Sequence, residues 1–183
     1  MSHKPDRFHQ VVEPGADDRS PWVSFSPPRI RVAAYVIRQR ARPELLIFEH
    51  VDVPEAGRQV PAGGVDADEG PSEAVLREVA EETGLADIVI VRALTTEDKP
   101  HPETGQPRRT TYFHLSATTD TADDWIHRVE GNGSDTGVTF ACYFHPLPLR
   151  HPLADDQDAW LGLIDPALAT RPSRTAWQPR DHR

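Results

Sequence analysis

Apolar residues follow two spacings along the chain, and these separate the expected strands from the expected helices. Continuous β-branched and apolar runs at residues 30–38 and 45–48 predict two neighbouring buried strands. Shorter runs predict further strands at about residues 59–60, 88–91, 110–115 and 137–144. Apolar residues at helical spacing (Leu153, Trp160, Leu161 and Ile164) predict a helix over residues 153–163.

The clearest helix prediction covers residues 71–83. Its interior, SEAVLREVAEET, is rich in good helix formers. Pro71 suits a first helical position, where its missing N–H would have no partner, and Gly84 tolerates the left-handed conformation that often ends a helix. Strands combined with two helices predict an α/β fold of three α/β/α layers around a mixed sheet, although the sequence leaves the strand order open.

Proline placement divides the chain into three parts. Residues 1–28 hold five of the 18 prolines and little periodicity, which predicts an extended arm. Residues 29–165 contain all the expected strands and helices and predict one domain. Residues 166–183 predict a tail. A domain of this size buries enough surface to fold without a disulfide or a structural metal.

Composition narrows the classes of function. The net charge of −9 opposes general binding to nucleic acid or to an anionic membrane surface. The first residues lack the apolar run typical of a signal peptide, and no apolar run of bilayer-spanning length occurs, so neither secretion nor membrane spanning is expected. Cys142 is the only cysteine, so an intramolecular disulfide is excluded and a small buried hydrophobic role is expected. We therefore expect a cytoplasmic protein with no nucleic-acid partner and no membrane partner.

Three acids in the expected helix suggest chemistry. Glu78, Glu81 and Glu82 stand at i, i+3 and i+4, so their carboxylates share one helix face and suit a hard divalent cation such as Mg²⁺. A solvated acidic face is the common alternative. Repulsion between the carboxylates and the helix dipole both count against that alternative, because a cation would offset the two penalties.

Neighbouring residues allow two interpretations each. Arg77 either orients a carboxylate through its planar five-donor head or is a surface residue. Gly63 and Gly64 either form a tight turn or bring backbone amides close to a phosphate. Arg108 and Arg109 either grip a phosphate or are solvated charges at a strand edge.

Residues 63–85 resemble the Nudix box, G-x5-E-x7-R-E-U-x-E-E-x-G-U with U a bulky aliphatic residue. Every specified position matches: Gly63, Glu69, Arg77-Glu78-Val79, Glu81-Glu82 and Gly84-Leu85. So many fixed positions rarely match by chance. The resemblance implies an α/β/α sandwich with a mixed central sheet and a loop–helix–loop catalytic motif, and the order of strands and helix over residues 29–165 agrees with that fold.

The same resemblance implies a metal-dependent hydrolase. Its substrate would be a small nucleotide: a nucleoside diphosphate linked to another moiety, such as ADP-ribose or an ADP-sugar, or a nucleoside triphosphate. The bond cleaved would be the pyrophosphate bond, and the cofactor would be Mg²⁺ or Mn²⁺.

Residue roles carry over from the matched positions. Glu78, Glu81 and Glu82 would be metal ligands, and Gly63 would add a backbone contact to the metal-bearing loop. Either Glu78 or Glu82 would also act as the base, and Arg77 would orient Glu78. Glu69 would support the structure of the loop or contact the metals through a water molecule. Gly84 would end the helix.

Three matters stay open. A non-catalytic nucleotide-binding sensor is the alternative function, although the chain keeps every carboxylate of the box. An acid outside the box would add a base or a ligand in many relatives, and the candidates here are Glu97, Asp98, Asp123, Asp124 and Glu130. The N-terminal arm either helps to build a homodimer or remains unstructured.

Overall fold

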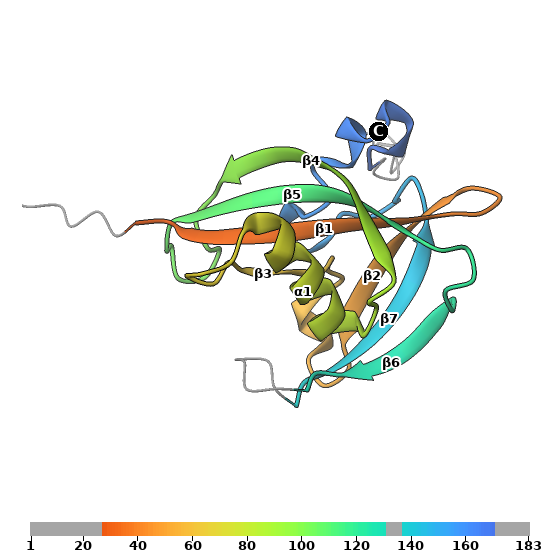
Figure 1. Cartoon of the computed structure of the whole chain (residues 1–183), viewed down its shortest axis with the longest axis horizontal. Coiled ribbons are helices and arrows are strands. Elements are labelled where there is room, and N and C mark those ends of the chain that lie inside the picture. The colour runs from red at the N-terminus through yellow and green to blue at the C-terminus, as the bar shows by residue number, and fades with distance from the viewer. Residues whose placement is uncertain (1–26, 131–136, 171–183) are drawn as a thin grey trace, which may run out of the picture.

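The computed structural model describes residues 27–130 and 137–170, and its seven strands form one sheet (Figure 1). The strand order is β4-β5-β1-β2-β7-β6, with β3 paired to β1. The strands are β1 (Arg29–Gln39), β2 (Pro43–His50), β3 (Ala62–Gly64), β4 (Ile88–Asp98), β5 (Arg108–Ala117), β6 (Asp124–Arg128) and β7 (Thr139–Pro146). Only β1 and β5 pair in parallel, so the sheet is mixed, as the sequence predicts.

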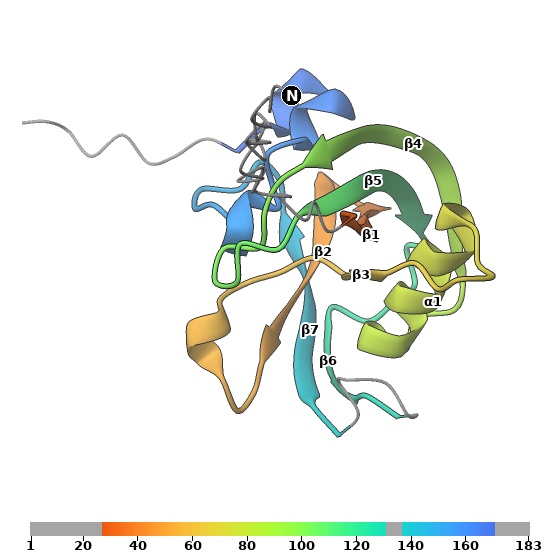
Figure 2. The same cartoon turned by 90° about the vertical axis from the view of Figure 1, so that its left-hand side faces the viewer.

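The central strand β1 is buried on both faces, which explains its unbroken apolar run. Successive side chains of a strand point to opposite faces. Val32 and Val36 pack in the core beneath helix α1 (Pro71–Thr83), whereas Tyr35 and Ile37 pack in the core beneath the C-terminal segment. Figure 2 shows α1 and the C-terminal segment on opposite sides of the sheet. The predicted α/β fold with a mixed central sheet is confirmed, although the layer opposite α1 consists of 3-10 turns.

Helix α1 has the bounds that the sequence predicts. The Gly70 N–H donates to Glu73 Oε2 at 2.9 Å, and Pro71 occupies the first turn. Gly84 ends the helix with φ at +75°, and its N–H donates to the Ala80 carbonyl at 2.8 Å. A residue with a side chain would be strained in that left-handed conformation.

The expected helix over residues 153–163 is wrong. This segment forms the 3-10 turns η2 (Ala154–Asp156) and η3 (Leu161–Leu163), followed by η4 (Pro166–Leu168). Asp155 and Asp156 have φ values of 53° and 56°, and such left-handed residues break a right-handed helix. Leu153 and Leu161 are nevertheless buried in the second core, which lies on the face of β1 opposite α1. The apolar spacing therefore indicated which residues are buried, but it did not indicate a helix.

Two strand predictions also need correction. Gln59 forms only an isolated bridge to Phe48, and the strand expected at residues 59–60 instead lies at β3. Strand β6 was not predicted. It is a five-residue edge strand whose side chains are exposed or half-buried, so it lacks an apolar run that would mark it in the sequence.

The structure describes only small parts of the predicted arm and tail. Most of the arm and residues 171–183 lie outside the described residues. Within the tail, Leu168 is buried in the second core, so packed structure continues to that residue. Cys142 is buried as predicted. None of the helices in the described part of the chain has the length and apolar character needed to cross a membrane.

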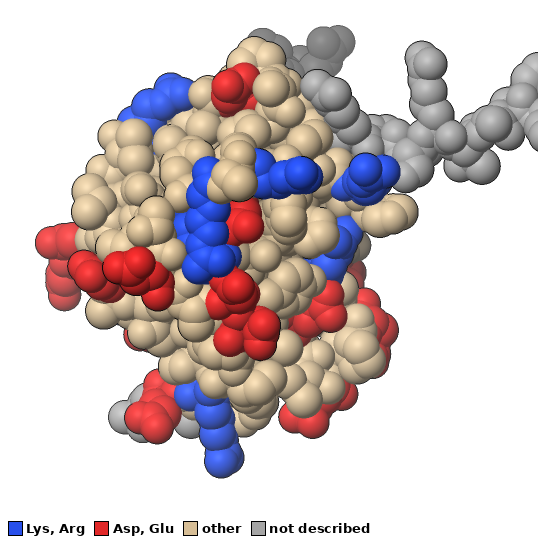
Figure 3. Space-filling view, turned by 90° about the vertical axis from the view of Figure 1, so that its right-hand side faces the viewer, with Lys and Arg blue, Asp and Glu red and all other residues tan. Residues whose placement is uncertain are grey.

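Charged side chains of both signs lie on the face drawn in Figure 3. Several Lys and Arg side chains gather across its upper half, and most Asp and Glu side chains lie below them.

Candidate active site

Helix α1 turns two of its glutamates toward the protein interior. Glu78 and Glu82 are only 8% and 7% exposed, because they stand four residues apart and continue the buried face that Ala74 begins. Glu81 lies at the rim, with 48% of its side chain exposed. Burying a carboxylate is costly unless it is paired or hydrogen-bonded. The two buried carboxylates therefore need hydrogen-bond or ion-pair partners.

Strand β3 supplies close contacts to these side chains. The Ala62 N–H donates to Glu82 Oε2 at 2.9 Å. A methyl group at Gly63 would overlap the carboxylate of Glu78, so only glycine allows the carboxylate to lie against the backbone here. The Gly64 carbonyl accepts from Arg77 Nη2 at 2.8 Å. Each residue of β3 thus meets one charged side chain of α1.

Arg77 joins three of the carboxylates. Its Nε and Nη2 atoms donate to the two oxygens of Glu69 at 2.9 and 2.8 Å. Its Nη1 donates to Glu78 at 2.9 Å and to Glu81 at 3.1 Å. The planar guanidinium suits this fork of contacts. Arg77 therefore contacts Glu78 as an orienting role requires, and Glu69 holds Arg77.

The electrostatic balance of this cluster is negative. Burial raises the pKa of Glu78, and the hydrogen bond from Arg77 opposes that rise. Hydrogen bonds from Arg77 lower the pKa of Glu69. Arg77 pairs with the carboxylates of Glu69, Glu78 and Glu81, and the charge of Arg31 acts on Glu78 and Glu82, so two guanidinium groups face four glutamates. Negative charge is left over, and a cation would balance it.

Side chains from β6 hold the end of α1 that carries Glu81 and Glu82. The Trp125 Nε1–H donates to the Thr83 carbonyl at 2.7 Å, and His127 Nε2 lies 2.8 Å from the Glu81 carbonyl. These contacts satisfy carbonyls that a helix end leaves without partners. The sequence did not predict that these two residues contact the helix end, because β6 itself carried no strand signal.

The glutamates suit a divalent metal by chemistry and charge. Carboxylate and carbonyl oxygens are the ligands that Mg²⁺ prefers. Over residues 27–130 and 137–170, no group of three or more His, Cys, Asp or Glu side chains is arranged so that it could hold a metal ion. Arg77 lies between Glu78 and Glu81, and Glu82 is turned to Ala62. The ligand set of Glu78, Glu81 and Glu82 stays a prediction.

The candidate acids outside the box occupy different surroundings. Glu97 accepts from the Tyr112 hydroxyl at 3.3 Å and lines a cavity of about 20 Å³ beside Arg31 and Ala62. Asp98 is paired with Arg109, and Asp123 with Arg40. Of these acids, Glu97 lies beside β3, the strand that contacts the glutamates of α1.

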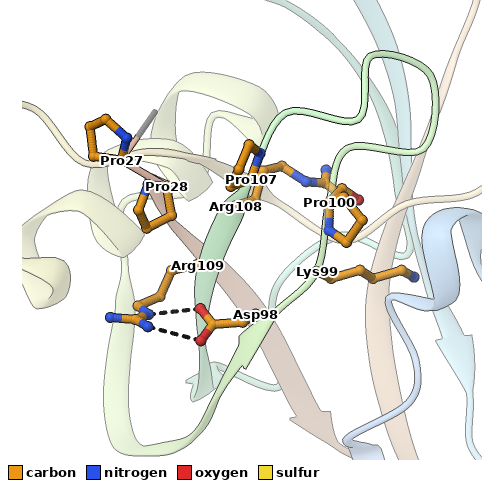
Figure 4. A pocket seen from close by; sticks show the side chains of 8 residues that line it. All are labelled: Pro27, Pro28, Asp98, Lys99, Pro100, Pro107, Arg108 and Arg109. Carbon is orange, nitrogen blue, oxygen red and sulfur yellow. Dashed lines mark hydrogen bonds and ion pairs between the residues drawn. The ribbon is translucent and has the colours of Figure 1, made fainter. Parts of the chain in front are cut away.

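A larger hollow of about 500 Å³ opens at the end of the β4–β5 hairpin (Figure 4). Its walls come from four prolines and four charged residues: Pro27, Pro28, Pro100, Pro107, Asp98, Lys99, Arg108 and Arg109. Arg109 donates to both oxygens of Asp98, at 2.7 and 2.8 Å. Arg108 is buried and paired with Asp155 at 2.6 Å. Both arginines are thus paired with carboxylates, which counts against a phosphate-gripping role; Arg109 fits the alternative of a solvated charge, whereas Arg108 is buried and does not.

Comparison with known proteins settles the family. A model of the NUDIX domain matches residues 27–161, which is more than half of the chain. The chain therefore belongs to the NUDIX family, and the resemblance seen in residues 63–85 is confirmed.

Individual relatives match less of the chain. An RNA pyrophosphohydrolase from Gluconacetobacter diazotrophicus is 43% identical over 74 residues, which cover 37% of this chain and 43% of that protein. The match thus spans less than half the length of that curated relative. A MutT NUDIX hydrolase from Burkholderia pseudomallei has a TM-score of 0.52 at 23% identity, over 76% of this chain and 99% of that one. A C. elegans Ap4A hydrolase has a TM-score of 0.47 at 17% identity, over 66% and 81%. The Burkholderia structure confirms the fold.

Proposed function

We propose that this chain is a metal-dependent hydrolase that cleaves the pyrophosphate bond of a nucleotide. The substrate would be a nucleoside diphosphate linked to another moiety, such as ADP-ribose or an ADP-sugar, or a nucleoside triphosphate. The observation that carries the proposal is the burial of Glu78 and Glu82 against the backbone of β3 in a cluster with surplus negative charge. Membership of the NUDIX family supports it.

The residues of the cluster would have three roles: metal binding, proton transfer and positioning of a carboxylate. Glu78, Glu81 and Glu82 would hold Mg²⁺ or Mn²⁺ beside Gly63, and the ion would supply positive charge that offsets the charge of the pyrophosphate and makes water more acidic. Glu78 or Glu82 would take the proton from the attacking water. Arg77 would keep Glu78 in place through the 2.9 Å hydrogen bond between them.

The test is product formation with Mg²⁺ over a panel of substrates, comparing the natural chain with Glu82→Gln. The panel holds nucleoside triphosphates, ADP-ribose, ADP-sugars, diadenosine polyphosphates and an RNA oligonucleotide with a 5′-triphosphate. We expect turnover of one class, a loss of about 10²- to 10⁴-fold in kcat with Glu82→Gln, and an unchanged unfolding midpoint without metal.

Glu73→Gln is the matched control, since it lies on the same helix and a glutamine can keep the hydrogen bond to Gly70. We expect the control to have normal turnover. Near-normal turnover of Glu82→Gln would remove Glu82 from the mechanism. Tight binding of one compound without any turnover, with either Mg²⁺ or Mn²⁺, would instead support the sensor function.

A further inference from the structure

The last turn of α1 has three carbonyls that need partners from outside the helix. The final four carbonyls of an α-helix accept no hydrogen bond from within the helix. The Gly84 N–H donates to the Ala80 carbonyl at 2.8 Å. This leaves the carbonyls of Glu81, Glu82 and Thr83. Two of these carbonyls belong to the proposed metal ligands, so whatever binds them also fixes where both glutamate side chains begin.

Side chains of the two neighbouring strands meet these carbonyls one by one. His127 Nε2 lies 2.8 Å from the Glu81 carbonyl, and a carbonyl only accepts, so the imidazole donates here. The Trp125 Nε1–H donates to the Thr83 carbonyl at 2.7 Å. Between them, the thiol of Cys142 on β7 lies 3.8 Å from the middle carbonyl. Side chains of β6 and β7 thus cap the end of α1.

The fit between β6 and the helix end is close. A methyl group at Gly84 would come within 2.9 Å of His127 Nδ1, so the glycine is needed for this approach as well as for its positive φ. Ile126 lies between the two capping residues, and its side chain points to the other face of the strand, where it is 66% exposed. Only alternate residues of β6 therefore touch α1.

The cap contains no lysine or arginine. The last turn of α1, residues 80–83, also contains no Lys, Arg or His, although the partial negative charge of a helix C-terminus favours such residues. A fixed cation there would compete with a divalent ion for the carboxylates of Glu81 and Glu82. The indole N–H and the thiol are uncharged donors. They satisfy the carbonyls and leave the surplus negative charge of the cluster to a bound cation.

Strand β6 is itself fixed by a buried arginine. Arg38 is only 1% exposed, and its Nη1 donates to the carbonyls of Thr121 and Ala122 at 2.6 and 3.1 Å. Its Nη2 lies 2.9 Å from Asp123 Oδ1. These three residues lead directly into β6. The capping side chains therefore come from a strand that is anchored to the core, although it lies at the edge of the sheet.

We propose that Trp125 and His127 are positioning residues for the metal site: by binding carbonyls at the end of α1, they fix the places of Glu81 and Glu82. This inference rests on the proposed function and adds residues outside the box to it. Mg²⁺ demands near-ideal ligand geometry, so a frayed last turn would weaken its binding. Neither residue touches the substrate in this proposal.

The affinity for Mn²⁺ tests the proposal without relying on turnover. Trp125→Phe keeps the ring and loses the N–H, and His127→Leu keeps the size of the side chain and loses the donor. Titration of the metal-free full chain, with free Mn²⁺ measured by electron paramagnetic resonance, should show affinity about 3- to 10-fold weaker in each variant.

Two further variants serve as controls. Ile126→Thr changes the same strand on the face that does not touch α1 and keeps a β-branched side chain, so we expect affinity within about twofold of the natural chain. His127→Gln keeps an N–H donor and should recover most of the affinity that His127→Leu loses. Equal weakening in Ile126→Thr would overturn the proposal, because it would reflect general loosening of the edge strand. If Trp125→Phe fails to fold, the comparison of His127→Leu with His127→Gln decides the matter.

Kinetics separate this inference from the proposed function. Trp125→Phe should lower kcat by about 10-fold at saturating Mn²⁺ with little change in the KM of the substrate, because the displaced groups act in the transition state. A lower unfolding midpoint in EDTA with unchanged Mn²⁺ affinity and kcat would make the cap purely structural and refute the positioning role, while the hydrolase stands. Mn²⁺ affinity that depends on Trp125 and His127, without hydrolysis of any compound, would keep the positioning role and refute the hydrolase. Absence of Mn²⁺ binding by the natural chain would overturn both.

Discussion

Two clusters of charged side chains in this molecule differ in their balance. At the β4–β5 hairpin, the cations Lys99, Arg108 and Arg109 face the carboxylates of Asp98, Asp155 and Asp156. At α1, Arg77 pairs with three glutamates and the charge of Arg31 acts on Glu78 and on the buried Glu82, so four carboxylates face two guanidinium groups. In a balanced cluster the cations and carboxylates pair with one another, and these pairs can stabilise the fold. An unbalanced cluster keeps surplus charge that a bound cation would neutralise, so imbalance indicates function better than the number of charges does.

The largest effect in the unbalanced cluster should come from Gly63→Ala. The added methyl group would overlap the Glu78 carboxylate and push it off β3. Because a misplacement of about 1 Å can cost about 10²-fold in rate, we expect kcat to fall by at least that factor. Steady-state kinetics with Mg²⁺ would measure the change. Normal kcat would show that the close contact between Glu78 and β3 is irrelevant to catalysis.

A smaller effect, on stability, should follow Asp155→Asn in the balanced cluster. Asparagine keeps the shape and tolerates the left-handed backbone at φ 53°. The buried Arg108 would lose its carboxylate partner, so we expect about 1–3 kcal/mol less unfolding free energy at pH 7. Denaturant unfolding in EDTA would measure it.

The difference in unfolding free energy between the natural chain and Asp155→Asn should become smaller as the pH falls. Burial alone would raise the pKa of Asp155, but hydrogen bonds from Arg108 and Lys99 hold the pKa below its ordinary value. A lowered folded-state pKa gives stability that is present above the unfolded value of about 3.9 and is lost as pH falls through the folded value. The gap between the natural chain and Asp155→Asn should therefore close below about pH 4. A gap independent of pH would contradict the ion-pair explanation.

Local sequence signals predicted one part of the molecule well. The bounds of α1 follow from Pro71 and Gly84, and the glutamate spacing predicted their shared face, because both depend on residues within one helix. The contacts with β3 depend on the pairing of Gly63 with Val32, far away in sequence, so no local pattern indicated them.

The wrong helix prediction over residues 153–163 has a physical cause. An apolar spacing reports which residues are buried and not how the backbone between them is folded. Leu153 and Leu161 are buried as a helix would require, yet the two left-handed aspartates turn the chain into separate 3-10 turns. Asp155 can adopt that backbone and also bind Arg108, a contact with a residue 47 positions away that no local reading of the sequence contains.

The smallest effect should come from Asp98→Asn, which removes the most exposed ion pair of the hairpin. Both partners face solvent, where such pairs contribute little and are screened by salt. We expect a change in the unfolding midpoint of about 1 °C or less, vanishing in high salt, and unchanged kcat. Asp98 is also one of the acids that could serve as an extra base. A large fall in kcat with an unchanged midpoint would place the hairpin in the active site, and charge balance would then no longer separate the two clusters.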